Sequence, residues 1–457
     1  MEANTIFVQI ASYRDPELIP TLNDMLEHAE NPENLRICIC WQHDPEQEPV
    51  DIFLDAGFTP SGYSEDEEMG YNIINMQRDG AELKVIDLHY HDTEGACWAR
   101  YQIQRQYEGE KYTLQLDSHH RFVPEWDTLA IDMLEGLRSE DCPKPLLTAY
   151  IPSFDPENDP GARVQVPWKM DFDRFIPEGA VFFRPSAIDH WKDLDTPMSS
   201  RFYSAHFCFA DGTFVEEVPH DPDYFFHGEE ISIAVRAYTW GYDLFHPHRI
   251  IAWHEYTRKG RTKVWDDHTT PQKSQGNVKL DWVERNDLCH KRNRILFGMD
   301  GEDPSQIDFG KFGFGTVRTV RQYEEHAGIS FQYRGVQQET LDRLDPPNNQ
   351  YVSYEGEEEW RATFARSNDV HVCVHKDQIE DLDDYDFFYV GAHDEDGNEI
   401  YRKDLTKDEI YKYLKSPNGF IDYRMIFLSS KRPASYTVWP HSESKEWMEK
   451  LDFPLNY

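Results

Sequence analysis

Basic residues are scarce in this chain. Lys and Arg total 46 against 85 Asp and Glu, so the formal net charge is −39. A field of this sign repels phosphate backbones, which argues against a nucleic-acid partner unless the fold assembles a basic patch. The same field attracts cations.

Long apolar runs and a cysteine framework are also absent. No uninterrupted apolar run approaches the roughly 18 residues of a membrane helix, and the first residues show neither the basic nor the apolar region of a signal peptide. The seven cysteines are odd in number and scattered, and Cys38 and Cys40 alternate along an expected strand. We interpret them as reduced packing residues. The expectation is a cytoplasmic protein without a membrane partner.

What the chain does contain suits packed cores. Apolar residues make up 39% of its 457 positions and aromatic residues 14%, which is too rich for a disordered chain. The length exceeds what one hydrophobic core usually serves. The sequence therefore predicts one large domain plus one or two smaller units.

The first 120 residues alternate between strand-like and helix-like segments. We expect strands at 5–15, 35–44, 82–90 and 111–119, with helices at 16–34 and 95–109. This order is typical of an α/β domain whose sheet is mainly parallel. Ligands gather at the carboxyl ends of such strands. Three strands end there in polar residues, namely Ser12-Tyr13-Arg14, Asp44 and Asp117-Ser118-His119.

The triplet Asp117-Ser118-His119 has the spacing of a metal motif. Alternate residues of an extended segment point to the same side, so Asp117 and His119 can reach one cation while Ser118 faces away or meets a ligand. Carboxylate plus imidazole suits Mn²⁺ or another first-row ion better than Ca²⁺. The alternative is a strand-end turn in which Asp117 caps a helix.

A second polar segment lies downstream. The acidic pair Glu229-Glu230 follows a glycine before a helix expected at 231–241, and His254 follows a strand expected at 249–253. A strand-end histidine is a natural third ligand for the same cation. The donors Tyr256, Arg258, Lys259 and Arg261 come next, and donors beside a metal suggest a diphosphate. The alternatives are a solvated loop and acidic residues that favour a helix N-terminus.

Six ordered blocks resemble a known family. Residues 93–134 are similar to a stretch of the polypeptide N-acetylgalactosaminyltransferases, and the closer resemblance is to the N-acetylglucosaminyltransferases of glycosyltransferase family 60, which modify hydroxyproline on a cytosolic protein. The resemblance covers about residues 5–335. Its blocks are VQIASYRDPEL, LQLDSHHRF, SAHFCFADGTFVEEVPHDPDYFFHGEE, AYTWGYDLFHP, WHEYTR and GFGTVRTVRQYE.

This resemblance implies a GT-A glycosyltransferase domain at 1–335, with a donor half at about 1–120 and an acceptor half and lid at about 121–335. Its metal ligands would be Asp117, His119 and His254, the last lying 18 residues beyond Arg236 as in the related family. His246 and His248 compete with His254 for this role. Asp266-Asp267-His268, in an expected lid, is a second choice of metal cluster.

The resemblance also implies roles for the other polar residues. Glu229 and Glu230 would be catalytic, with Glu229 matching the family's acidic motif better. The implied donor-binding residues are Ala11, Ser12, Tyr13, Arg14, Asp44, Gly95, Arg100, Ser118, Gly228, Tyr256 and Arg258. Turn formation and helix capping are the structural alternatives for any one of them.

The chain continues past the matching region. After a linker at about 343–349, residues 350–457 carry strand-like runs and one helical signal at 406–416. This pattern predicts a small, mainly β module, for which an immunoglobulin-like fold is one option. This module could position an acceptor, act as a stabilising lid or drive self-association.

The function expected from the resemblance is retaining transfer of a sugar, GlcNAc first, from a UDP-sugar to a hydroxyl of a protein or peptide. The cofactor would be Mn²⁺ or another divalent cation such as Mg²⁺. Four alternatives stay open: a glycan, small-molecule or modified nucleic-acid acceptor, and an inactive sugar-nucleotide-binding protein. A metallohydrolase that uses Asp117, His119 and His254 is a further rival.

Overall fold

The structure of the chain is a computed structural model that describes residues 4–44, 46, 49–348 and 354–455. The chain divides into two compact units, Met1–Gly328 with Arg343–Gln350 and Ile329–Asp342 with Tyr351–Tyr457. Residues 329–335 therefore belong to the second unit here, whereas the sequence analysis assigned them to the first. Residue 349 of the expected linker and 350–353 of the expected module lie outside the described residues.

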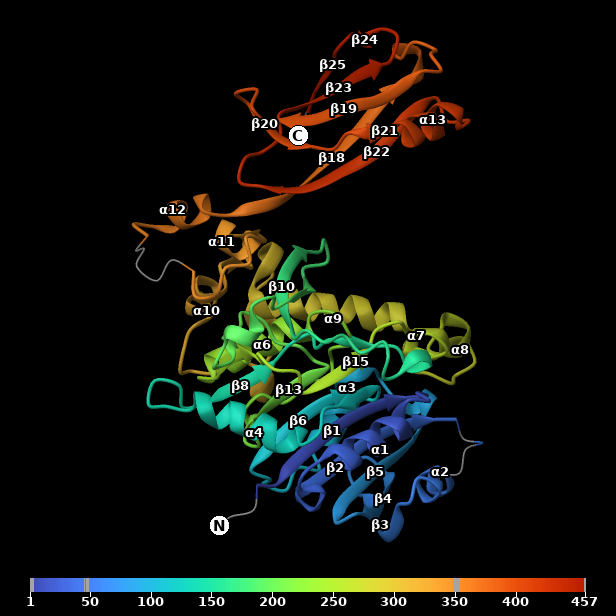
Figure 1. Cartoon of the computed structure of the whole chain (residues 1–457), viewed down its shortest axis with the longest axis vertical. Coiled ribbons are helices and arrows are strands. Elements are labelled where there is room, and N and C mark those ends of the chain that lie inside the picture. Colours follow the sequence, from blue (N-terminus) through green and yellow to red (C-terminus); the bar gives the residue numbers. More distant parts are fainter. Residues whose placement is uncertain (1–3, 45, 47–48, 349–353, 456–457) are drawn as a thin grey trace. The chain divides into compact units, whose positions relative to one another are not determined.

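A ten-stranded mixed sheet forms the centre of the first unit (Figure 1). The strands β6, β1, β2 and β5 run parallel, and antiparallel strands extend the sheet on both sides. The predicted α/β class is confirmed. In spatial order the strands are β12 (Met198–Ser199), β14 (Asp243–His246), β8 (Pro145–Thr148), β13 (Phe207–Asp211), β6 (Tyr112–Asp117), β1 (Ile6–Tyr13), β2 (Leu35–His43), β5 (Ala81–His89), β4 (Tyr71–Arg78) and β3 (Thr59–Asp66).

Helices cover both faces of this sheet because its strands are apolar on both. In β1, Ile6, Val8 and Ile10 belong to one buried cluster with helices α1, α2 and α4, while Phe7 belongs to another with α3. The helices of this unit are α1 (Leu18–His28), α2 (Pro49–Asp55), α3 (Ala96–Gln104), α4 (Trp126–Leu137), α5 (Phe214–Glu217), α6 (Glu229–Thr239), α7 (Val264–Asp267), α8 (Thr270–Ser274), α9 (Trp282–Phe297) and α10 (Val320–Ala327). Two-sided burial is typical of parallel strands in α/β domains.

Two smaller sheets accompany the large one. The strands β7 (His120–Phe122), β15 (Ala252–Glu255) and β9 (Ser153–Phe154) form a three-stranded sheet, and β10 (Trp168–Phe175) pairs with β11 (Val181–Ala187). The strand β7 begins two residues after β6 ends. The small sheet with β15 therefore starts directly at the carboxyl edge of the large sheet.

Several elements differ in their bounds from the sequence-based expectation. The helix expected at 16–34 is α1, which ends at His28, and the helix expected at 95–109 is α3, which ends at Gln104. The strand expected at 249–253 is β15, which is displaced to Ala252–Glu255, so that His254 lies within the strand and not after it. The hairpin β3–β4 was not predicted, because residues of β3 are mostly exposed and give no strong apolar alternation.

The second unit is mainly β. Its strands form two antiparallel sheets, β16-β17-β18-β22 and β20-β19-β23-β24 with β21 and β25 beside the second, and residues of both sheets share one buried cluster. The expected helical signal is α13 (Lys407–Lys415). The other elements are α11 (Gln338–Leu341), α12 (Glu357–Ala362), β16 (Ile329–Ser330), β17 (Gly335–Val336), β18 (Ala365–His375), β19 (Tyr385–His393), β20 (Glu399–Arg402), β21 (Leu405–Thr406), β22 (Phe420–Ser429), β23 (Ser435–Ser442), β24 (Glu446–Trp447) and β25 (Leu451–Pro454). An immunoglobulin-like topology stays a prediction.

Two observations bear on the sequence-based exclusions. All seven cysteines fall in the described ranges and are free thiols, five of them buried. Among the residues that the structure describes, no helix is both long and apolar enough to pass through a bilayer.

We predict that Leu114→Ala strongly destabilises the first unit. Leu114 lies in β6 between β1 and β13 and is 0% exposed, so truncation leaves a cavity that costs about 2–5 kcal/mol. The control is Leu54→Ala in α2, where the side chain is 43% exposed. Urea unfolding followed by tryptophan fluorescence should separate the two variants, and equal midpoints would contradict the proposed core.

Candidate active site

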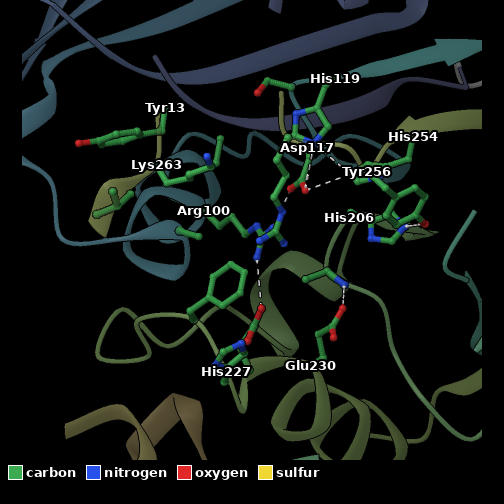
Figure 2. Close-up of a pocket in the computed structure, with 18 of the residues that line it drawn as sticks. Tyr13, Arg100, Asp117, His119, His206, His227, Glu230, His254, Tyr256 and Lys263 are labelled. Carbon is green, nitrogen blue, oxygen red and sulfur yellow. Dashed lines mark hydrogen bonds and ion pairs between the residues drawn. The ribbon is translucent and has the colours of Figure 1, made fainter. Parts of the chain in front are cut away.

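A cavity of about 540 Å³ lies at the carboxyl edge of the parallel strands. Its walls come from the ends of β1 and β6, the N-terminus of α6, the strand β15 and the segment that follows it (Figure 2). The sequence-predicted residues that line it are Ala11, Tyr13, Arg100, Asp117, Ser118, His119, Gly228, Glu229, Glu230, His254, Tyr256 and Arg258. Segments more than 100 residues apart in sequence thus meet at one site.

Three expected metal ligands converge in this cavity. Nε2 of His119 lies 3.0 Å from Nε2 of His254, and Oδ2 of Asp117 lies 3.5 Å from Nε2 of His254 and 3.8 Å from Nε2 of His119. One ligand atom from each residue lies within 4.8 Å of the others, which makes them a candidate group for one ion. Figure 2 shows the three side chains turned toward one another.

Strand pairing explains this convergence. The strand β6 ends at Asp117, and β7 pairs with β15 in a register that places His120 opposite His254. The residue before His120 is His119, so the pairing carries His254 to the Asp-x-His turn. His120 itself does not line the cavity, and its Nδ1 contacts the carbonyl oxygen of Asp117 at 2.9 Å.

The protonation states of this group fit a divalent cation. Burial and the neighbouring imidazoles hold the pKa of His254 well below its ordinary value, although Asp117 opposes them, so its ring is neutral. Burial would raise the pKa of Asp117, but the contact with His254 and the charge of Arg100 outweigh it and lower that pKa well below the usual range. An ionised carboxylate beside a neutral imidazole suits Mn²⁺ and other first-row ions.

A buried arginine connects this group to the acidic pair. Nη2 of Arg100 lies 2.9 Å from Oδ1 of Asp117, and its Nη1 lies 3.8 Å from Oε1 of Glu229. Glu230 accepts hydrogen bonds from the Tyr150 hydroxyl at 2.8 Å and from the backbone N–H of Ala205 at 3.0 Å. Arg100 therefore holds two of the site's carboxylates near its guanidinium.

The acidic pair titrates far from the ordinary range of glutamate. Burial and the neighbouring Glu230 raise the pKa of Glu229 to about 8, and burial raises that of Glu230 to about 7. Both residues begin α6, which starts where Gly228 adopts a φ of 100°. Two buried carboxylates at one helix start are costly to ionise together, so the cavity favours a cationic or hydrogen-bonding guest beside them.

The expected donor-binding residues near the ends of β1 and β2 divide into two groups. Ala11 and Tyr13 line the cavity, whereas Ser12, Arg14 and Asp44 do not. Ser12 is buried on the opposite side of β1, as strand alternation requires. Arg14 lies 3.7 Å from Asp44, and the ring of Tyr90 stands 4.5 Å from its guanidinium. Arg14, Asp44 and Tyr90 therefore lie together outside the lining of the cavity.

The second choice of metal cluster has another role. Both carboxylate oxygens of Asp267 lie 2.9 Å from Nη1 of Arg14, and one accepts the Tyr13 hydroxyl at 2.8 Å. His268 contacts the carbonyl oxygen of Tyr90 through Nε2 at 2.9 Å. Asp266, Asp267 and His268 do not form a candidate ion group among the described residues. The rival histidine His246 also bonds elsewhere, to the carbonyl oxygen of Thr148.

The remaining predicted donor-site residues shape the walls. Gly95 does not line the cavity, but its φ is 116° and a Cβ there would lie 2.7 Å from the ring of Phe225, which does. Tyr256 donates a hydrogen bond to the carbonyl oxygen of Ile151 at 2.8 Å, and Arg258 has a φ of 55°. Gly95 is thus required for close packing of α3 against the cavity wall.

Sequence reasoning missed six polar residues of this cavity: Asp15, Tyr150, His206, His227, Thr262 and Lys263. His206 stacks on His254 with ring centroids 4.3 Å apart. Asp15 directly follows the strand end Ser12-Tyr13-Arg14, so the expectation that ligands gather at strand ends could have included it. His206 and His227 lie inside one of the blocks that resemble the family, but neither was singled out there, and Tyr150 lies outside all six blocks.

Comparison with known proteins identifies the family. The profile of the family described as Glycosyltransferase (GlcNAc) matches residues 5–333. The chain belongs to this glycosyltransferase family. It is therefore a glycosyltransferase, and family membership together with the mixed α/β sheet confirms the predicted GT-A class. Membership in glycosyltransferase family 60 stays a prediction. No curated protein matches the chain.

Solved structures that are similar to this glycosyltransferase share little sequence with it. GalNAc-T7 with UDP, GalNAc and Mn²⁺ is 12% identical over 70% of this chain and 54% of its own, with a TM-score of 0.39. Staphylococcus aureus TarS 1–349 with UDP-GlcNAc is 10% identical over 64% and 73%, with a TM-score of 0.34. The mannosyltransferase PcManGT from Pyrobaculum calidifontis with GDP-Man and Mn²⁺ is 12% identical over 56% and 58%, with a TM-score of 0.34. The chain spans about half the length of the GalNAc-T7 chain it matches.

Proposed function

We propose that this glycosyltransferase moves GlcNAc from UDP-GlcNAc to a hydroxyl group of a protein, with retention of the anomeric configuration and with a divalent cation bound. The observation that supports this most is the meeting of Asp117, His119 and His254 with the acidic pair Glu229 and Glu230 in one cavity. Membership in a GlcNAc glycosyltransferase family supports the sugar. The resemblance of residues 5–335 to retaining enzymes supports the stereochemistry and the protein acceptor.

The residues that would hold the cation are Asp117, His119 and His254. Bound there, Mn²⁺ or Mg²⁺ would neutralise the charge that develops on the diphosphate as the sugar leaves. Arg258, Arg261 and Lys263 line the same cavity from the segment after β15 and would add donors to the diphosphate oxygens. A covered diphosphate would also be shielded from water, which otherwise hydrolyses the donor.

Uridine would lie beside Tyr13, at the end of β1. The hydroxyl of Tyr13 and the guanidinium of Arg14 are held by Asp267. We infer that a nucleoside takes over one or both of these contacts when it binds. Arg14 and Asp44 would then serve the nucleoside from the edge of the cavity.

The reaction breaks the bond between the anomeric carbon and a phosphate oxygen, and UDP leaves with the electron pair. The acceptor oxygen forms the new bond on the same face, and its proton passes to the departing phosphate oxygen. Glu229, held 3.8 Å from Arg100, would orient the sugar hydroxyls or stabilise the cationic anomeric centre. Glu230 is fixed by Tyr150 and the Ala205 N–H, so it supports the wall that the sugar contacts.

We expect release of UDP from UDP-GlcNAc to require Mn²⁺, because the three ligands lie where the diphosphate would bind. A panel of UDP-sugars should be incubated with the purified chain, with Mn²⁺ and separately with a chelator, and UDP measured. Metal-dependent release from UDP-GlcNAc above the other donors supports the proposal. Preference for UDP-GalNAc would correct the sugar, and no binding or release with any donor would refute the nucleotide site.

His254→Ala should weaken Mn²⁺ binding by about 100-fold or more. Loss of a residue that only supports a ligand typically costs 10–100-fold in metal affinity, and loss of a ligand should cost at least the upper end. Mn²⁺ affinity can be measured by electron paramagnetic resonance. The matched control is His248→Ala, the rival histidine, which lies outside the candidate ion group. If the two variants bind Mn²⁺ alike, His254 is not a ligand.

Glu229→Gln should lower kcat more than it lowers affinity for UDP. The side chain would act on the sugar and not on the nucleotide, and its loss should reduce turnover by about 100-fold or more, as for other single groups that stabilise developing charge. Affinity for UDP is measured by calorimetry in the presence of Mn²⁺. Equal losses in kcat and UDP affinity would assign Glu229 to donor binding or to folding.

A further inference from the structure

The carboxylate of Asp15 is an enclosed acidic group at the candidate metal site. Its side chain is 4% exposed, although it follows β1 in a polar turn. The strands β1 and β6 are parallel neighbours with Ala11 opposite Asp117, so the segment after β1 lies against the Asp-x-His turn after β6. The topology that exposes Asp117 and His119 to the cavity therefore also brings Asp15 to them.

One carboxylate oxygen of Asp15 contacts the Asp-x-His turn, and the other contacts the backbone two residues further along the chain. Oδ2 lies 2.7 Å from Nδ1 of His119 and accepts the Ser118 hydroxyl at 2.7 Å. Oδ1 accepts the backbone N–H of Glu17 at 2.9 Å. The carboxylate is thus fixed on both sides and cannot swing away from the imidazole without breaking other hydrogen bonds.

This contact determines which nitrogen of His119 is free. A carboxylate accepts hydrogen bonds and does not donate them, so Nδ1 of a neutral ring must carry the proton. Nε2, the atom that faces His254 and Asp117, is then left with its lone pair toward the candidate ion position. His254 lacks such support, since its buried Nδ1 has no partner among the described residues.

We infer that Asp15 is a positioning residue that fixes the tautomer and the ring orientation of His119 as a metal ligand. This inference rests on the proposed function, because it presupposes that His119 binds the cation. Asp15 acts through His119 and does not itself contact the donor sugar.

A rival role for Asp15 is to anchor the segment after β15. Nη1 of Arg261 contacts Nδ1 of His119, and it lies 2.7 Å from Nε2 of that ring and 3.4 Å from Oδ2 of Asp15. Its Nη2 lies 2.8 Å from Oε2 of Glu255. In that case, loss of Asp15 would weaken Mn²⁺ binding because Arg261 is no longer held. A variant that removes the charge of Arg261 should then lose the same Mn²⁺ affinity.

The test is Asp15→Asn in the full chain. Asn keeps the shape of the side chain but has one acceptor oxygen where Asp15 has two. Its NH₂ group must therefore face either the backbone N–H of Glu17 or the pair Ser118 and His119, and the hydrogen bonds on that side are lost. Binding of Mn²⁺ alone, followed by electron paramagnetic resonance without sugar nucleotide, should weaken by about 10–100-fold, the usual effect of losing a carboxylate behind a ligand histidine. The Mn²⁺ concentration that half-saturates UDP release should rise by the same factor.

The chain offers a matched control. Asp87 contacts Nε2 of His43 at 2.6 Å, a carboxylate–imidazole pair that lies outside the cavity lining. Asp87→Asn makes the same chemical change, and it should leave Mn²⁺ affinity unaltered. Thermal unfolding of both variants identifies any loss of fold, and Asp15→Glu should recover part of the Mn²⁺ affinity.

The outcomes separate this inference from the proposed function. If the unaltered chain does not bind Mn²⁺, the metal site fails and the inference fails with it. If it binds Mn²⁺ and Asp15→Asn binds equally well, only the role of Asp15 is overturned. Arg261→Gln with the same loss of affinity as Asp15→Asn would assign the effect to the anchored segment instead, and unaltered or tighter binding in that variant supports Asp15.

Discussion

The pairing of β7 with β15 is the constraint on which the candidate site depends. Both strands are short, and their register places His254 opposite His120, one residue beyond the Asp-x-His turn. Without this pairing, Asp117 and His119 would form only the carboxyl end of a parallel strand, and the histidine from 135 residues downstream would have no fixed position. The metal-ligand geometry is therefore a property of strand register, which a shift by one residue would reverse, because it would turn His254 to the other face.

Charge compensation is the second requirement of this region. Arg100 is buried, and an isolated guanidinium there would be very costly. Asp117 and Glu229 lie on either side of it, so the metal-ligand group and the acidic pair share one counter-ion. The pKa of Glu229 nevertheless stays raised to about 8, because burial disfavours its charged form and Glu230 repels it by more than Arg100 compensates. A further cation in the cavity would lower the cost of ionising the acidic pair.

Local patterns in the sequence were enough to predict the candidate residues that directly follow the end of a strand. The α/β class, the Asp-x-His turn and the start of α6 all come from short segments whose apolar spacing is visible in one dimension. His254 was chosen as a candidate from the strand that precedes it, yet it lies inside β15, because pairing with β7 extends the strand past Trp253. Strand ends are decided by the partner strand, and that information lies outside the local sequence.

The residues that were missed or moved depend on contacts over long separations. His206 reaches the site by stacking on His254, and Tyr150 by donating a hydrogen bond to Glu230, and the local sequence around each of them predicts neither contact. Asp267 resembled a metal ligand beside Asp266 and His268, but Arg14, 253 residues away, takes its carboxylate. An arginine of the chain thus competes with a metal ion for the carboxylate of Asp267, and sequence alone does not show which arginine that is.

The charge of the cavity differs from that of the whole chain, and this difference matters for an anionic donor. The chain holds nearly two acidic residues for each basic one, 85 against 46. The cavity lining holds four acidic and four basic side chains, the basic ones being Arg100, Arg258, Arg261 and Lys263. Arg100 pairs with Asp117, and Arg261 pairs with Glu255 and Asp15. Arg258 and Lys263, which both come from the segment after β15, are the other basic side chains of the lining that can serve the donor. The overall field would repel a nucleoside diphosphate, so its binding must rely on short-range contacts with this segment and with a cation, which act within a Debye length of about 8–10 Å at physiological salt.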